Sequence, residues 1–124
     1  MKVLIIDDDN FIRTVYESLL KQENIEPVLA ENGESGLALA REHSPDLILL
    51  DMIMPGKSGF EVIEELKADE ALKSIPVIIF SSLSQQSDID EAMKLGAAGY
   101  YPKDQNASES VVEKVKELLM KGVE

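Results

Sequence analysis

Polar side chains that could do chemistry follow four short apolar runs of this sequence. In chain order they are Asp7-Asp8-Asp9, Asp51, Ser81-Ser82 and Lys103. Carboxylate oxygens are ligands that Mg²⁺ prefers, and an ionised aspartate beside such a cation can attack a phosphoryl group and form an aspartyl phosphate. A hydroxyl and an amine could then hold the phosphoryl oxygens. If the fold brings these residues together, they indicate metal-assisted phosphoryl transfer to Asp51.

The apolar runs that precede these residues have the composition of buried strands. Three stretches are continuously apolar, as strands covered on both faces must be: Val3–Ile6, Leu47–Leu50 and Val77–Phe80. The expected strands are Lys2–Asp7, Ile25–Ala30, Leu47–Asp51, Ile75–Ser81 and Gly99–Tyr101.

Between the expected strands, apolar residues recur at helical spacing. The stripes are Phe11, Ile12, Val15, Tyr16, Leu19 and Leu20; Leu37 and Ala40 within Glu34–Glu42; Phe60, Ile63 and Leu66; Ile89, Ala92 and Met93, ended by Gly96; and Val111, Val115, Leu118 and Leu119. Alternating strands and helices predict an α/β fold, a single-domain (βα)₅ doubly wound parallel sheet. Ligands bind such sheets outside the carboxyl ends of the strands, where the polar residues stand.

The first aspartate group and Asp51 would repel each other in one pocket. Without a counter-charge, some of these carboxylates would hold protons near neutral pH, and a divalent cation removes the conflict. Magnesium suits such a site because it needs only one or two carboxylates together with phosphate oxygens and water. One of Asp8, Asp9 and Asn10 is expected to cap the following helix instead, since these residue types are good N-caps.

The ordered set of residues resembles the response-regulator receiver domains of two-component signalling, of the chemotaxis-regulator-like kind. The matching positions are Ile5-Ile6-Asp7-Asp8, Asp51 through Gly59, Ser81 thirty positions after Asp51, Gly96-Ala97, and Tyr100 three positions before Lys103. The resemblance runs along the whole chain. It implies the flavodoxin-like strand order 2-1-3-4-5, and a signalling switch rather than an enzyme.

The resemblance also implies roles for particular residues. The Mg²⁺ site would be made by Asp7, Asp8, Asp51 and the backbone carbonyl of Ile53. A sensor histidine kinase or a phosphotransfer protein would supply the phosphoryl group to Asp51, and Lys103 and Ser81 would contact it. Ser81 and Tyr100 would form the switch: the hydroxyl moves toward the phosphate and the Tyr100 ring turns inward. The face formed by the fourth helix, the fifth strand and the fifth helix would then change its affinity for a downstream protein.

Two features depart from the usual pattern of the family. The order Pro102-Lys103-Asp104 puts proline before the lysine rather than after it, so we expect a trans bond between Lys103 and Asp104. The residues two positions after Asp51 and Ser81 are Ile53 and Leu83, and neither apolar side chain can orient an attacking water. We therefore predict slow self-dephosphorylation, with a phosphate lifetime nearer hours than seconds.

Bulk composition excludes several kinds of partner. Twelve basic and twenty-four acidic residues give a net charge of −12, which disfavours direct binding to nucleic acid or to anionic membranes. The first apolar stretch is too short for a signal peptide or a membrane span, and this favours a cytoplasmic location without membrane insertion. At 124 residues the chain is expected to be one receiver domain, 1–124, with no output domain.

Three alternatives compete with this interpretation. An aspartyl phosphatase of the haloacid-dehalogenase type could use Asp7-x-Asp9, although Phe11 stands where that family has threonine or valine. A flavodoxin shares the architecture, but three aspartates would repel a flavin phosphate. A receiver-like docking module that never takes phosphate would have the same fold and is distinguished only by experiment.

Overall fold

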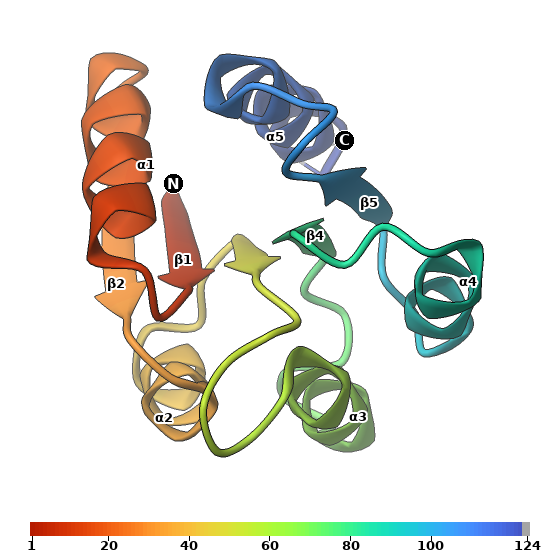
Figure 1. The fold of residues 1–124 in the computed structure, drawn as a ribbon. Coiled ribbons are helices and arrows are strands. Elements are labelled where there is room, and N and C mark those ends of the chain that lie inside the picture. Colours follow the sequence, from red (N-terminus) through yellow and green to blue (C-terminus); the bar gives the residue numbers. More distant parts are fainter. Residues whose placement is uncertain (123–124) are drawn as a thin grey trace.

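Five strands and five helices alternate along the chain in a computed structural model that describes residues 1–122 (Figure 1). The strands are β1 (Lys2–Ile6), β2 (Glu26–Ala30), β3 (Leu47–Leu50), β4 (Val77–Ser81) and β5 (Gly99–Pro102). The helices are α1 (Asn10–Gln22), α2 (Gly33–His43), α3 (Gly59–Ala68), α4 (Gln86–Lys94) and α5 (Ser108–Gly122). All neighbouring strands are parallel, in the order β2-β1-β3-β4-β5, which confirms the predicted fold and strand order.

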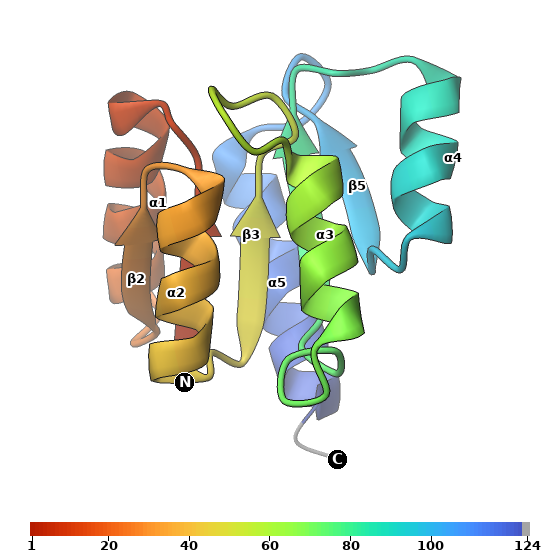
Figure 2. The ribbon, with the colours of Figure 1, turned by 90° about the horizontal axis from the view of Figure 1, so that it is seen from below.

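Helices cover both faces of the sheet, as the continuously apolar strands require. In Figures 1 and 2, α1 and α5 lie on one face while α2, α3 and α4 lie on the other. Residues of β1, β3 and β4 alternate between the two resulting cores: Leu4, Ile48 and Ile79 pack toward α2, α3 and α4, whereas Val3, Leu49 and Ile78 pack toward α1 and α5. Strands β1, β3 and β4 are therefore packed on both faces, and this packing fixes the positions of the residues that follow them.

Local caps begin the helices close to the strand ends. The Asp9 carboxylate accepts hydrogen bonds from the backbone N–H groups of Phe11 and Ile12, so Asp9 is the residue of the first aspartate group that caps α1. Ser58 and Glu61 form a capping box at the start of α3. Of the three candidates Asp8, Asp9 and Asn10, the cap is therefore Asp9, and Asp8 is left free of that task.

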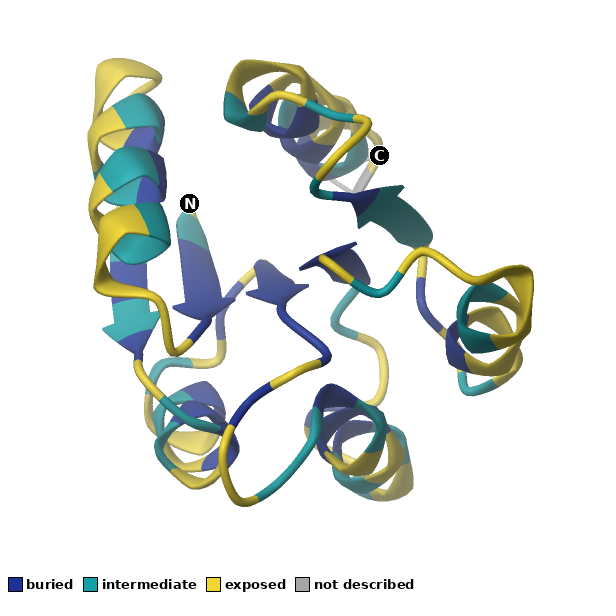
Figure 3. Ribbon diagram, in the orientation of Figure 1, coloured by how far each residue is buried: buried dark blue, intermediate teal, exposed yellow. Residues whose placement is uncertain are grey.

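Two apolar residues were wrongly expected to face the core. Phe11 is 71% exposed and Met93 is 44% exposed. Figure 3 shows that α1 and α4 each have an exposed outer side. Phe11 is in the first turn of α1, whereas the buried residues of this helix, Tyr16 and Leu20, lie further along it. Helix α4 packs mainly against β5, and Ala92 is its one buried residue.

The fifth strand keeps its pairing despite the proline at its end. Pro102 pairs with Ser81 at the end of β4, and the Lys103 N–H then donates a 2.7 Å hydrogen bond to the Ser81 carbonyl. The Lys103–Asp104 bond is trans, as predicted. Asp104 is exposed in the following turn, four residues before α5.

Candidate functional site

Asp7 and Asp51 lie side by side because they follow neighbouring strands at the same edge of the sheet. Ile6 pairs with Leu50, and the Asp51 N–H donates a 2.9 Å hydrogen bond to the Ile6 carbonyl. Both aspartates are buried, with 3% and 4% of their surface exposed, whereas Asp8 is exposed. One carboxylate oxygen from each of the three residues lies within 4.8 Å of the others. The predicted acidic pocket therefore exists.

Lys103 brings a positive charge to this pocket from the far side of β4. Its Nζ donates a 3.2 Å hydrogen bond to Asp7 Oδ2 and lies 3.7 Å from Asp51 Oδ2. The ammonium also stands over the ring of Phe80, 5.6 Å from the ring centre. Lys103 therefore reaches both buried carboxylates, although proline precedes it rather than follows it.

The two buried carboxylates are electrostatically strained. Burial raises the pKa of Asp51 above its ordinary value, and the charge of Lys103 and the hydroxyl of Ser81 only partly oppose this shift. Burial likewise raises the pKa of Asp7, with a hydrogen bond from the Asp9 N–H acting against it and the Asp51 charge adding to it. The positive charge of Lys103 does not fully offset the cost of burying two carboxylates. A further positive charge bound at the site would therefore stabilise the folded protein.

The donor set fits a hard divalent cation. One carboxylate oxygen from each of three aspartates is within reach of a single ion, and the sequence has no cysteine to offer a thiolate. Ile53 follows in the loop, where its N–H lies 3.4 Å from Asp51 Oδ1 and its side chain is 49% exposed. The part assigned to its carbonyl stays a prediction.

Ser81 and Tyr100 lie behind the acidic pocket on paired strands. Ser81 is completely buried, and its Oγ accepts a 3.3 Å hydrogen bond from the Leu83 N–H. The Tyr100 ring packs against the core beneath α4, and its hydroxyl donates a 2.8 Å hydrogen bond to the Leu83 carbonyl. Tyr100 thus points inward in this structure, while Tyr101 packs toward α5 on the opposite face, as alternation predicted.

Two contacts of the pocket were not anticipated from the sequence. Arg13 Nη1 donates a 2.7 Å hydrogen bond to the Asp7 carbonyl, which ties the loop after β1 to the second turn of α1. Phe80, directly before Ser81, is 4% exposed and lies beneath the Lys103 ammonium. An arginine early in a helix is commonly a surface residue, and an apolar residue within a strand is commonly part of the core. Neither residue therefore indicated a contact with the pocket from the sequence alone.

Comparison with known proteins agrees with this geometry. Residues 3–116 match the family model of the response regulator receiver domain. The chain belongs to this family. Protein PilH of Pseudomonas aeruginosa is 35% identical over 102 residues, covering 82% of this chain and 84% of that protein. The polar-differentiation response regulator DivK of Brucella anthropi is 36% identical over 101 residues, covering 82% of each.

Solved structures of receivers share the whole architecture. The receiver domain of the Francisella response regulator 1452 has a TM-score of 0.88 and 28% identity, covering 97% of each chain. The Vibrio cholerae chemotaxis protein CheY4 has a TM-score of 0.86 and 26% identity, covering 94% of this chain and 97% of that one. The predicted family and fold are therefore confirmed. Among residues 1–122, none of the helices has the length and apolar character needed to cross a bilayer.

Proposed function

We propose that this receiver accepts a phosphoryl group on Asp51 from a phosphohistidine of a sensor histidine kinase or a phosphotransfer protein. The observation that carries the proposal is the position of the Asp51 carboxylate, buried beside Asp7 with the Lys103 ammonium 3.7 Å from its Oδ2. The positive charge of Lys103 at this distance reduces the electrostatic repulsion between the buried Asp51 carboxylate and an approaching anionic phosphoryl group. Membership of the receiver family supports the same role.

The transfer is a displacement at phosphorus. An Asp51 carboxylate oxygen forms the new P–O bond while the P–N bond to the donor histidine breaks, and the imidazole keeps the electron pair. Lys103 is placed to neutralise a phosphoryl oxygen, and the buried Ser81 hydroxyl at the end of β4 would donate to another. The chain thus acts as substrate and as catalyst of its own modification, in keeping with a signalling-switch family.

Asp7, Asp8 and Asp51, with the Ile53 carbonyl, are the residues that would hold magnesium. When bound, Mg²⁺ offsets the charge of the carboxylates and of the phosphoryl oxygens. Asp7 is fixed for this task by its own contacts, because its Oδ1 accepts a hydrogen bond from the Asp9 N–H at 2.9 Å while Oδ2 faces Lys103. Asp8, being exposed, is free to adjust to a ligand.

The output would be a change at the face formed by α4, β5 and α5. Attraction of the Ser81 hydroxyl to the phosphoryl group would hold the segment after β4 inward, and the Tyr100 hydroxyl is bonded to that segment at Leu83. A stabilised inward Tyr100 changes the surface that a downstream protein meets. The strongly acidic chain favours a protein partner over nucleic acid, and we place it in the cytoplasm with the kinases it would serve.

Two-dimensional NMR of the full chain tests the proposed switch. Adding phosphoramidate to the protein in Mg²⁺ should shift the backbone amides of Ser81, Leu83 and Tyr100, together with neighbours on α4 and β5. The Asp51→Asn variant, which keeps the shape of the side chain, should show none of these shifts. Shifts confined to the acidic pocket would contradict a switch, and equal shifts in Asp51→Asn would contradict Asp51 as the acceptor.

A further inference from the structure

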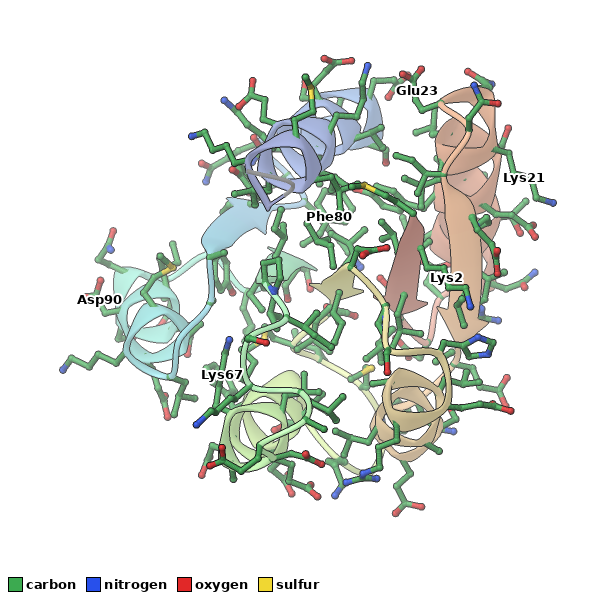
Figure 4. The ribbon with its side chains drawn as sticks, turned by 180° about the vertical axis from the view of Figure 1, so that it is seen from behind. Lys2, Lys21, Glu23, Lys67, Phe80 and Asp90 are labelled. Carbon is green, nitrogen blue, oxygen red and sulfur yellow. The ribbon has the colours of Figure 1, made fainter. Side chains whose placement is uncertain are left out.

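Phe80 occupies a position that the proposed phosphoryl transfer does not yet use. It is the residue of β4 directly before Ser81, and its side chain faces the opposite side of the strand, toward α1 and α5. Figure 4 labels it in the interior of the molecule. Only 4% of its surface is exposed. The Nζ of Lys103 lies over its ring, 5.6 Å from the ring centre.

The Phe80 ring is itself held from behind. Tyr16, a fully buried residue of α1, meets it edge to face, with ring centres 5.4 Å apart and an angle of 79° between the ring planes. This is a favourable geometry for two aromatic rings, because the positive edge of one meets the negative face of the other. The ring below Lys103 therefore has little freedom to move or turn.

Lys103 depends on such support more than a shorter side chain would. Its ammonium is carried on four flexible methylene groups and must cross the end of β4 to reach Asp51. The two carboxylates that attract it lie at 3.2 and 3.7 Å, so ion pairing alone favours Asp7 over the acceptor. A cation within about 6 Å of an aromatic face gains attraction from the ring, and the effect is larger where water is partly excluded.

We propose that Phe80 is a positioning residue for Lys103. Its ring face holds the ammonium in the space between Asp7 and Asp51, and Tyr16 fixes the ring. This proposal rests on the phosphoryl transfer proposed above and deepens it. In this role Phe80 acts through the lysine and does not itself bind the phosphoryl group.

Phosphorylation kinetics give the first test. Phe80→Leu keeps an apolar side chain but removes the ring, and Phe80→Tyr keeps the ring. With phosphoramidate and Mg²⁺, the rate constant at saturating donor should fall roughly three- to tenfold in Phe80→Leu, the range that the lost attraction would give. Phe80→Tyr should stay near the wild-type rate. An unchanged rate in Phe80→Leu, or an equal loss in both variants, would overturn the proposal.

Ile78→Val is the matched control for lost packing. Ile78 is fully buried two residues earlier on the same face of β4, and it packs in the same core toward α1 and α5. It should lower thermal stability without slowing phosphorylation. If Ile78→Val slows the reaction as much as Phe80→Leu does, the effect of Phe80 is general packing and the proposal is wrong.

Proton NMR of the lysine side chain gives a second test that needs no phosphorylation. Because the ammonium lies over the ring, the ε-methylene protons of Lys103 should resonate upfield of those of exposed lysines. The shift should vanish in Phe80→Leu and persist in Ile78→Val. An unshifted Lys103 in the wild-type protein would overturn the proposal. If the wild-type protein accepts no phosphoryl group, the proposed function fails, while this measurement still decides whether Phe80 holds Lys103.

Discussion

Lys103 Nζ lies 3.7 Å from Asp51 Oδ2, although the two residues follow strands that are separated by β4. The contact exists because the Lys103 N–H remains bonded to the Ser81 carbonyl, which extends the pairing of β5 with β4 by one residue. The lysine therefore leaves the sheet at the same level as the acceptor. The Pro102-Lys103 order is therefore compatible with an ion pair between Lys103 and Asp51.

Removing the Lys103 charge should destabilise the protein when no divalent cation is added. Lys103→Met keeps the length of the side chain but leaves two buried carboxylates without their counter-charge, at a cost of about 1–3 kcal/mol in the free energy of unfolding. Urea unfolding at neutral pH measures this. Lys73→Met, which breaks an exposed pair with Glu70, should change stability much less. Equal effects of the two variants would contradict a strained acidic pocket.

Neutralising Asp7 should stabilise the cation-free protein. Burial raises the pKa of Asp7 and of Asp51, so between the ordinary pKa of 3.8 and the raised value the folded state binds more protons than the unfolded chain. Stability then falls as pH rises through this range, and the penalty is complete above the raised pKa. Asp7→Asn removes part of it and should raise the free energy of unfolding by about 1 kcal/mol at pH 7, with the gain vanishing near pH 4.

Magnesium should reverse the order of stability seen in that experiment. The cation should stabilise the wild-type protein at pH 7 because it binds the folded state, and it should stabilise Asp7→Asn less. Asp90→Asn, a substitution of the same kind on the exposed surface of α4, should match wild type with and without Mg²⁺. A Mg²⁺ effect that is the same in wild type and Asp7→Asn would contradict the proposed ligand set.

The inward position of Tyr100 should depend on its hydroxyl. Tyr100→Phe removes the hydrogen bond to the Leu83 carbonyl and should lower the free energy of unfolding by about 1 kcal/mol. The rate of Asp51 phosphorylation by phosphoramidate should change little, because the hydrogen bond that is lost is the one to the Leu83 carbonyl. Tyr101→Phe, on the other face of β5, is the matched control and should cost less. A larger loss in Tyr101→Phe would contradict this assignment.

Phosphorylated Asp51 should lose its phosphoryl group slowly. The Ile53 side chain is half exposed at the mouth of the pocket and Leu83 packs against the core, so neither can hydrogen-bond an attacking water. Ile53→Asn should shorten the lifetime about tenfold, as one hydrogen bond of about 1.4 kcal/mol made only in the transition state would do. Ile53→Leu should leave it unchanged. A wild-type half-life of seconds in Mg²⁺ would contradict the prediction.

The sequence predicted the elements of this fold well because its strands are buried on both faces. Val3–Ile6 and Val77–Phe80 are apolar throughout, which leaves few alternatives to a covered parallel sheet. Periodicity failed at Phe11 and Met93, where a helical pattern continues beyond the surface that the sheet offers. The extent of that surface depends on how far each helix overlaps its strands, and spacing along one helix does not contain this information.

The candidate site was predictable in its residues and unpredictable in its contacts. Asp7 and Asp51 end expected strands and Lys103 follows another, and parallel strands bring their carboxyl ends to one edge. The contact of Lys103 with Phe80 depends instead on the register of β5 against β4 and on the path of a long side chain. Neither is encoded at a single position, so the support beneath the lysine became visible only in three dimensions.

Intact-mass measurement after incubation with phosphoramidate and Mg²⁺ tests the central claim most directly. The wild-type protein should gain the mass of one phosphoryl group, and the adduct should be absent from Asp51→Asn. Asp90→Asn should be modified like wild type, which controls for the loss of an aspartate as such. A wild-type protein without any adduct, or an undiminished adduct in Asp51→Asn, would contradict the account.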